Sequence, residues 1–324
     1  MYIVFLILGF VFLLKGADFL IKGASSIARR LNISDLVIGL TIVAFGTSAP
    51  ELLVNIDASI LGRSDIVLGN ILGSNIANIL LILGVASIIS PLVIRSRTVL
   101  VEIPLGIFAI IVLGILGNDI FINKSLNSFI SKTDGIIMIF FFMIFLVYAY
   151  KIAKTEIFRD GEEQNISLLK SIIYLIIGIV ALPLGGKWVV ESAVEIATLI
   201  GLSQFVIAAT IVAIGTSLPE LVTSTVAAYQ KKPDIAVGNV VGSNIFNVFW
   251  ILGISAVIKP IPINSINNWD ILIAGLIGVF MFLFLHARKR FFVQTEYVLS
   301  RWSGIIFLVF YFGYVVFLIL RGTV

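Results

Sequence analysis

The stretch Gly46-Thr47-Ser48-Ala49-Pro50-Glu51 occurs a second time in the chain as Gly215-Thr216-Ser217-Leu218-Pro219-Glu220. Each copy places a carboxylate, two hydroxyls and a proline inside a segment that is otherwise apolar enough to span a bilayer. A charged side chain at the centre of a bilayer costs at least about 3 kcal/mol, so it is retained where it pairs, lines water or binds an ion. We therefore expect the two copies to face each other and to form one cation site.

The composition is typical of a chain that crosses a membrane many times. The 324 residues are 60% hydrophobic and only 12% charged, and the mean hydropathy is +1.15. A soluble domain cannot bury that much apolar surface, so we predict an all-α polytopic membrane protein. The chain has no cysteine, which excludes disulfides and thiolate metal sites. Its net charge of +4 indicates basic loops and lipid contacts rather than nucleic-acid binding.

Ten apolar segments are long enough to span the bilayer, which requires about 20 residues for each helix. They lie near residues 2–27, 33–59, 65–90, 98–117, 133–153, 168–192, 203–229, 234–258, 268–286 and 302–320. The longest polar stretch runs from Lys151 to Lys170 and separates the fifth segment from the sixth. We therefore predict a first domain at 1–155, a cytoplasmic linker at 156–167 and a second domain at 168–324.

The two halves of the chain repeat each other. Adding 169 to a residue number in the first half gives the matching residue in the second, and this offset holds without a gap from Thr41 to Pro91. Each half holds five segments, and because five is odd the second half must enter the membrane from the opposite side. The ten transmembrane helices are therefore expected to form two inverted five-helix repeats, related by a pseudo-two-fold axis in the membrane plane.

Lysine and arginine are distributed unequally between the two sides of the predicted membrane protein. The connections between segments 1–2, 3–4, 5–6, 7–8 and 9–10 share one side and carry most of the basic residues, for example Arg29, Arg95, Lys231 and Arg288. The positive-inside rule places that side in the cytoplasm. We therefore predict a multi-pass protein of the cell membrane (inner or plasma membrane), with both termini outside the cytoplasm.

Pro50 and Pro219 predict a break in the two helices that carry the repeated stretch. A proline inside a helix cannot donate a hydrogen bond and clashes with the carbonyl four residues earlier, here that of Gly46 or Gly215. The unwound segment would offer backbone carbonyls, hydroxyls and a carboxylate, an all-oxygen set that hard cations such as Na⁺ and Ca²⁺ prefer. The alternative is a kinked helix whose glutamate only hydrogen-bonds to a neighbouring hydroxyl.

A second repeated motif, Gly-Asn-x-x-Gly-Ser-Asn-x-x-Asn, runs from Gly69 to Asn78 and again from Gly238 to Asn247. Its serine and its last asparagine are four residues apart and therefore share one helical face. We expect this pair to contact the ion or the glutamates in both copies, and the glycines to allow close helix packing. The asparagines interpreted as structural are Asn70, Asn75, Asn239 and Asn244.

The charges of the predicted site indicate which ions it would hold. Two carboxylates balance one Ca²⁺ or two Na⁺, and the other donors are neutral oxygens. No lysine or arginine lies near the two glutamates in the sequence to neutralise them. Histidine and cysteine are also absent from the motifs, which argues against zinc or copper.

The two copies of Gly-Thr-Ser-x-Pro-Glu, each followed by Gly-Asn-x-x-Gly-Ser-Asn-x-x-Asn, resemble the repeats of the calcium/cation antiporter superfamily, and within it those of prokaryotic sodium/calcium exchangers. The resemblance implies secondary active exchange of Ca²⁺ for Na⁺ by alternating access. No ATP, cofactor, covalent step or obligate protein partner is implied, so we do not expect an enzyme. The implied ion ligands are Glu51, Glu220, Thr47, Ser48, Thr216, Ser217, Ser74, Ser243, Asn78, Asn247 and the carbonyls of Ala44 and Ala213.

Other functions are compatible with the same motifs. Some relatives carry aspartate where this chain has Asn247, including potassium-dependent exchangers, so the asparagine argues against potassium co-transport. Exchange of Ca²⁺ for H⁺ is the second alternative. A passive cation channel would also need an oxygen cage, although inverted repeats within one chain favour alternating access. A membrane-embedded hydrolase that uses the two glutamates as acid and base is the last alternative.

Segments one and six are the expected moving part, sliding across a core formed by the other eight. The glycines expected at the sliding contact are Gly9, Gly16, Gly178, Gly185 and Gly186. Asp18 with Lys22 and Lys187 with Glu191 are charge pairs spaced four residues apart at matching positions of these two segments. We interpret each as a helix-end ion pair that reaches the membrane interface.

Overall fold

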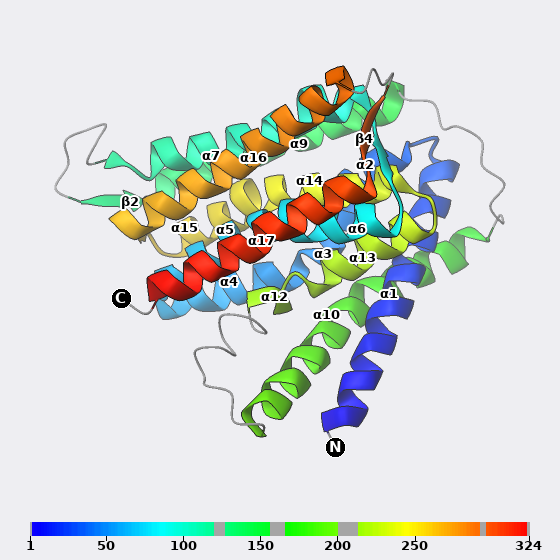
Figure 1. The fold of residues 1–324 in the computed structure, drawn as a ribbon, viewed down its shortest axis with the longest axis horizontal. Helices are drawn as coiled ribbons and strands as arrows, with labels where there is room; N and C mark the ends of the chain where they lie inside the picture. Colours follow the sequence, from blue (N-terminus) through cyan, green and yellow to red (C-terminus); the bar gives the residue numbers. More distant parts are fainter. Residues whose placement is uncertain (1, 120–126, 156–165, 200–212, 292–295, 323–324) are drawn as a thin grey trace.

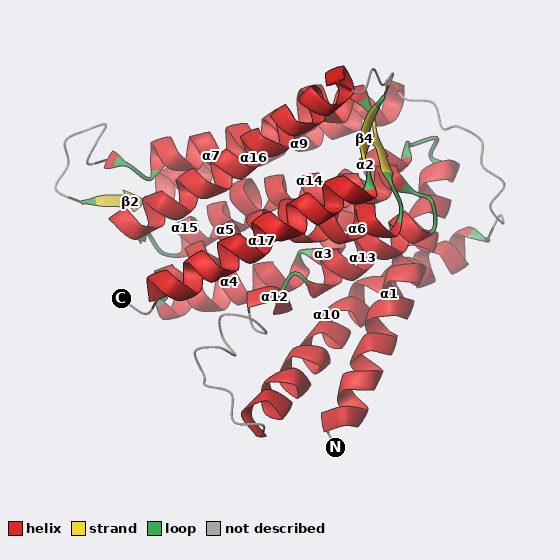
Figure 2. Ribbon diagram, viewed as in Figure 1, coloured by secondary structure: helices red, strands yellow, loops and turns green. Residues whose placement is uncertain are grey.

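The computed structural model describes residues 2–119, 127–155, 166–199, 213–291 and 296–322. Almost all of these residues are helical, and four short strands lie near the two ends of the helix bundle (Figure 2). Helices are expected here because a chain in lipid must satisfy its backbone hydrogen bonds internally. Most of the predicted linker at 156–167 lies outside the described residues, so its boundaries stay a prediction.

The first half runs from the N-terminal helix to a fifth long helix (Figure 1). Its elements are α1 (Tyr2–Arg30), α2 (Asp35–Ile38), the π-helical turn η1 (Gly39–Val43), α3 (Ala44–Thr47), α4 (Ala49–Leu61), α5 (Ser64–Ala77), the π-helical turn η2 (Asn78–Ile82), α6 (Leu83–Ile89), β1 (Leu92–Ile94), the π-helical turn η3 (Thr98–Glu102), α7 (Ile103–Leu116), β2 (Ser128–Ile130) and α9 (Lys132–Thr155).

The second half repeats this order. Its described elements are α10 (Leu168–Leu199), α12 (Ala213–Gly215), α13 (Leu218–Tyr229), α14 (Pro233–Ile245), the π-helical turn η5 (Phe246–Leu252), α15 (Gly253–Ile258), β3 (Ile261–Ile263), α16 (Ser265–Phe291), β4 (Tyr297–Leu299) and α17 (Arg301–Gly322). A residue with left-handed backbone conformation occurs at the same place in both halves: Gly62 (φ 70°) and, 169 residues later, Lys231 (φ 61°). The duplication in the sequence is therefore also a duplication of backbone conformation.

Within the described ranges, eight helices are long and apolar enough to cross a membrane, and the bent pair Asp35–Thr47 and Ala49–Leu61 forms a ninth span. The remaining predicted segment, 203–229, begins in residues that the structure does not describe and continues as α12 and α13. The chain is thus a multi-pass membrane protein. Over the described residues the helices follow the predicted segments, and α10 and α16 continue several residues further.

Four short strands, which the sequence analysis did not predict, tie the two halves together. β1 pairs antiparallel with β4, and β2 pairs antiparallel with β3. Each pair takes one strand from each half, and the two pairs lie at opposite ends of the bundle (Figure 1). Because β1 follows the third segment and β4 the ninth, this pairing agrees with the prediction that connections 3–4 and 9–10 share one side.

Glycines bring helices of the two halves into backbone contact near the middle of the bundle. A Cβ at Gly238 would lie 3.1 Å from the Cα of Gly39, and one at Gly242 would lie 2.5 Å from the carbonyl oxygen of Leu40. The predicted close packing is therefore confirmed for these two glycines of α14, which contact η1. Around Gly73, the repeat partner of Gly242, no described atom lies within 4 Å of such a Cβ.

We expect Gly242→Ala to destabilise the protein, because the added methyl group would overlap a backbone oxygen that cannot move without shifting η1. Overpacking of this kind costs about 1–3 kcal/mol. The measurement is the melting temperature of the detergent-solubilised protein, followed by size-exclusion chromatography after heating. Gly106→Ala is the matched control, since no atom of the described residues lies within 4 Å of a Cβ there. Equal melting temperatures for the two variants would contradict the packing argument.

The helices α1 and α10 pack along each other and project together from the rest of the bundle (Figure 1). A Cβ at Gly9 would lie 2.9 Å from the carbonyl oxygen of Gly185, and one at Gly178 would lie 2.8 Å from that of Gly16. The prediction that these four glycines form a sliding contact with the core is therefore wrong. They lie in the contact between α1 and α10, and the two helices can approach closely because a glycine has no side chain.

The two predicted ion pairs on α1 and α10 are present. Lys22 Nζ lies 2.9 Å from Asp18 Oδ2, and Lys187 Nζ lies 3.7 Å from Glu191 Oε1. Asp18 also accepts a hydrogen bond of 2.8 Å from Gln230 Nε2. This contact ties α1 to the connection that follows α13.

Candidate cation site

Both copies of Gly-Thr-Ser-x-Pro-Glu interrupt their helices, as the sequence predicts. In the first half α3 ends at Thr47 and α4 begins at Ala49, and the two pieces are bent by 48°. In the second half α12 ends at Gly215 and α13 begins at Leu218. Each proline lies in the first turn of the helix after the break, where its missing N–H has no helical partner to lose.

The break places each glutamate in the first turn of a new helix. Glu51 is the third residue of α4 and Glu220 the third residue of α13, and each is 1% exposed. The N-terminal turn of a helix carries unpaired N–H groups and the positive end of the helix dipole, which stabilise a carboxylate. In the described part of the chain neither carboxylate forms an ion pair with a basic side chain. The two carboxylates are also near enough to repel each other.

The serine hydroxyls connect the two motifs of opposite halves. Ser48 Oγ donates a hydrogen bond of 2.8 Å to Glu220 Oε1, and its oxygen lies 3.0 Å from Ser243 Oγ. At the repeat-related position, Ser217 Oγ lies 3.2 Å from Ser74 Oγ. The four predicted serines are buried, and all of these contacts join opposite halves. The two serine–serine contacts join a first motif to a second motif, and the bond from Ser48 to Glu220 joins the two first motifs.

Each threonine is held by an asparagine of the opposite half. Thr47 Oγ1 donates to Asn239 Oδ1 at 3.0 Å, and Thr216 Oγ1 donates to Asn70 Oδ1 at 3.1 Å. The same hydroxyls lie beside the carboxylate of the opposite motif. The sequence analysis did not anticipate these partners for Asn70 and Asn239. Their recurrence at the offset of 169 in membrane-spanning segments was the available signal.

The last asparagine of each second motif lies at a π-helical turn. Asn78 is the first residue of η2 and Asn247 the second residue of η5, and π-helical turns inside helices are frequent at functional sites. The amide nitrogen of Asn78 donates to Asn244 Oδ1 at 2.8 Å, and that of Asn247 donates to Asn75 Oδ1 at 3.0 Å. The amide oxygens of Asn78 and Asn247 are therefore directed away from these partners.

Four buried oxygen atoms of the cluster have no hydrogen-bond donor among the described residues. They are Glu51 Oε2, Glu220 Oε2, Asn78 Oδ1 and Asn247 Oδ1. A buried acceptor without a partner costs about 1–3 kcal/mol, and more when it is charged. All four are hard oxygen acceptors, two from each half, so the arrangement can lower this cost by binding a hard cation.

The backbone carbonyl of Ala44 is already partly in use. It accepts a hydrogen bond of 2.9 Å from the Ser48 N–H, and Thr47 Oγ1, whose single proton is donated to Asn239, lies 3.3 Å away. Because a carbonyl has two lone pairs, one of them is left for an ion at this atom. Its repeat partner Ala213 begins α12, directly after residues outside the description.

The α1–α10 pair covers both breaks. A Cβ at Gly46 would lie 3.1 Å from a side chain of α10, and one at Gly215 would lie 2.6 Å from Val190 of the same helix. Gly186, the remaining glycine predicted at the sliding contact, does face the core, with Pro219 at 3.7 Å from its Cβ position. A movement of this pair would therefore uncover the unwound segments.

Sequence comparison finds matches along both halves of the chain. The sequence model of the family described as sodium/calcium exchanger protein matches residues 1–151 and 170–320, two stretches related by the offset of 169. The putative antiporter CaxA of Alkalimonas amylolytica is 36% identical over 324 residues, which cover 96% of each chain. The sodium/calcium exchanger MaX1 of Methanosarcina acetivorans is 33% identical, with 97% of each chain covered.

The fold is similar to that of a solved exchanger. The structure of the sodium-calcium exchanger NCX_Mj soaked with 2.5 mM Na⁺ and 10 mM Sr²⁺ superposes with a TM-score of 0.78 and 33% sequence identity. The match covers 96% of this chain and 98% of that one. The family match spans nearly the whole chain, and the inverted repeats meet at a buried, oxygen-rich cluster. The chain belongs to the sodium/calcium exchanger family.

Proposed function

We propose that the protein is a secondary active antiporter that exchanges Ca²⁺ for Na⁺ across the cell membrane. The observation that carries this proposal is the set of four unpartnered buried oxygens, which the two halves contribute equally. The proposed ion ligands are Glu51, Glu220, Thr47, Ser48, Thr216, Ser217, Ser74, Ser243, Asn78, Asn247 and the carbonyls of Ala44 and Ala213. The name of CaxA supports antiport, and the names of MaX1 and NCX_Mj support exchange of sodium and calcium.

The two carboxylates explain why exchange would be obligatory. Two like charges buried near each other repel more strongly than they would in water, because the effective dielectric constant around them is lower. In an ion-free site this repulsion would persist in the occluded state, in which the site is closed to both sides of the membrane. The ion-free protein would therefore rarely change between its two orientations. Bound Ca²⁺, or Na⁺ in its place, neutralises Glu51 and Glu220 and allows the protein to change its orientation. Each transfer of one ion type would then require the return of the other.

Alternating access would come from movement of α1 and α10 as one body. The glycine contacts between these helices support a rigid pair, and the position of the pair over both breaks supports its role as the gate. The remaining helices would form the fixed core. No chemical step or cofactor enters this cycle, so the protein would act as a transporter and not as an enzyme.

The sidedness and domain boundaries complete the proposal. The connections that carry most of the lysine and arginine would face the cytoplasm, with both termini on the other side. The first repeat would occupy 1–155 and the second 168–324, joined by a cytoplasmic linker at 156–167. The surrounding lipid bilayer would be the only permanent partner.

The test is ⁴⁵Ca²⁺ uptake into proteoliposomes that contain the purified protein. We expect rapid uptake when the vesicles are loaded with Na⁺ and diluted into Na⁺-free buffer, because outward movement of Na⁺ drives Ca²⁺ inward. Parallel vesicles with only an H⁺ gradient, or with K⁺ supplied in addition to Na⁺, test the two related exchange modes. Uptake driven by H⁺ alone would overturn the proposal, and uptake without any counter-ion gradient would identify a channel.

A further inference from the structure

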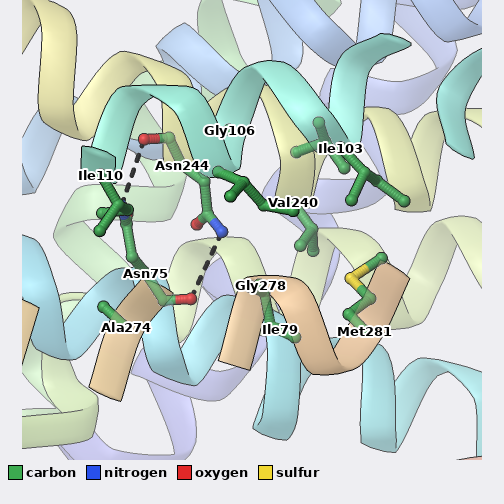
Figure 3. Close-up of a pocket in the computed structure, with 12 residues that line it drawn as sticks. Asn75, Ile79, Ile103, Gly106, Ile110, Val240, Asn244, Ala274, Gly278 and Met281 are labelled. Carbon is green, nitrogen blue, oxygen red and sulfur yellow. Dashed lines mark hydrogen bonds between the residues drawn. The ribbon is translucent and has the colours of Figure 1, made fainter. Parts of the chain in front are cut away.

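Asn75 and Asn244 meet on the axis that relates the two halves. Asn75 Nδ2 donates to the backbone carbonyl of Asn244 at 3.3 Å, and Asn244 Nδ2 donates to the backbone carbonyl of Asn75 at 3.4 Å. Figure 3 shows both bonds, with α5 and α14 crossing at the two asparagines. The sequence pattern indicates a structural role for this pair, and their contacts indicate a more specific one.

The carbonyl contacts determine how four amide groups are oriented. A backbone carbonyl can only accept, so the atom of Asn75 that faces it must be the nitrogen, and Asn75 Oδ1 must face the other way. That oxygen lies 3.0 Å from the amide of Asn247, which must therefore present its own nitrogen. By the same reasoning, the amide of Asn78 must present its nitrogen to Asn244 Oδ1, which lies 2.8 Å away.

The consequence is that the amide oxygens of Asn78 and Asn247 are turned away from Asn244 and Asn75. Both oxygens are buried, and the part of the chain that the structure describes supplies no donor to either. An asparagine whose amide could rotate would present its nitrogen to a cation half of the time, and a nitrogen donor repels a cation. The orientation of the ligand amides therefore depends on Asn75 and Asn244.

Hydrogen bonds, and not packing, hold the two asparagines in place. A cavity of about 30 Å³ adjoins them on the side of α7 and α16, and its lining includes Gly106 and Gly278 (Figure 3). The cavity leaves room for the amides to turn if a hydrogen-bond partner is removed. This feature distinguishes them from side chains that are locked by close contact.

We infer that Asn75 and Asn244 are positioning residues that act across the repeats: Asn75 orients the ligand amide of Asn247, and Asn244 orients that of Asn78. The inference rests on the proposed function, since it requires a cation at the cluster. It implies that the orientation of the ligand amide from each repeat is determined by an asparagine of the opposite repeat. Loss of such a partner behind a metal ligand lowers affinity by about 10-fold to 100-fold.

The experiment is a pair of double-mutant cycles on Ca²⁺ affinity, measured by ⁴⁵Ca²⁺ binding to the purified full chain. We expect Asn75→Ala and Asn247→Ala each to weaken binding by about tenfold or more, and the double variant to be little weaker than Asn247→Ala alone. Asn75→Ala combined with Asn78→Ala is expected to approach the product of the single effects. The mirror cycle pairs Asn244→Ala with Asn78→Ala, which should be coupled, and with Asn247→Ala, which should not.

A role in packing alone would give a different pattern. Asn75 and Asn78 are neighbours on consecutive turns of the same helix, so damage from packing would couple this pair at least as strongly as the cross-repeat pair. Equal coupling in the two cycles, or additive effects of Asn75→Ala and Asn247→Ala, would overturn the inference. Failure of the parent protein to bind Ca²⁺ would overturn the proposed function and the inference together.

Two controls keep the result interpretable. Asn118→Ala removes a similar asparagine pair between α7 and α16, in which Asn118 and Asn268 exchange hydrogen bonds of 2.9 and 2.7 Å away from the cluster. We expect its Ca²⁺ affinity to equal that of the parent. If Asn75→Ala is not recovered as a folded protein, Asn75→Ser replaces it in the cycle, because serine is too short to reach the amide of Asn247.

Discussion

Glu51→Gln and Glu220→Gln are each expected to abolish Na⁺-dependent ⁴⁵Ca²⁺ uptake without destabilising the protein. Each substitution removes one of the two buried charges and keeps the size of the side chain. Loss of one partner of a buried charge interaction costs about 3–5 kcal/mol, so Ca²⁺ affinity should fall by about a hundredfold or more. In ion-free buffer the melting temperature should equal or exceed that of the parent, because the repulsion between the two carboxylates is gone.

The measurements are uptake by proteoliposomes, Ca²⁺ binding and melting temperature, made on the same preparations. Glu191→Gln is the matched control, since Glu191 is a glutamate of a membrane-spanning helix that is 61% exposed and paired only with Lys187 among the described residues. We expect this control to transport normally. A melting temperature that falls sharply in Glu51→Gln, with uptake preserved, would indicate a structural carboxylate and contradict the proposed ligand role.

A covalent link between α1 and the core is expected to abolish exchange while leaving Ca²⁺ binding intact. The natural chain has no cysteine, so cysteines introduced at two positions can be linked without side reactions. Asp18 of α1 and Gln230 after α13 are 2.8 Å apart at their side chains, and a short bifunctional thiol reagent can join cysteines at these positions. If α1 and α10 move together as the gate, this link holds the gate in one orientation.

A second link distinguishes movement of the pair from movement within it. Ser26 of α1 and Ser171 of α10 have their hydroxyl oxygens 2.7 Å apart, so Ser26→Cys with Ser171→Cys can form a disulfide. We expect exchange to continue in this variant, because the link lies inside the body that moves. Exchange that survives the link between positions 18 and 230, or that stops with the link between 26 and 171, would contradict the proposed gate.

Much of the fold followed from local patterns. The apolar segments predicted the membrane spans because a helix in lipid needs a continuous apolar run, and the offset of 169 predicted the inverted repeat because an odd number of spans reverses the second copy. The breaks at Ser48 and Ser217 followed from the neighbouring prolines, which cannot continue a helix on their N-terminal side.

Other features depended on contacts between residues far apart in the chain. The four strands are too short to carry a recognisable pattern, and they form only because β1 meets β4 and β2 meets β3 across the halves. The glycines of α1 and α10 were assigned to the wrong surface because a small residue shows that a neighbour is close without showing which neighbour it is.

The sequence by itself determined the class of protein and the duplicated architecture, because hydrophobic runs and an odd number of spans are local or countable properties. The paired acids also predicted which residues form the site. Only the tertiary structure decided which polar group faces which. Asn75 and Asn244 have the same residue type as the proposed ligands Asn78 and Asn247, three positions earlier on the same helices. Their different roles arise because α5 and α14 cross at the pseudo-two-fold axis, where backbone carbonyls orient one pair of amides and leave the oxygens of the other pair for an ion.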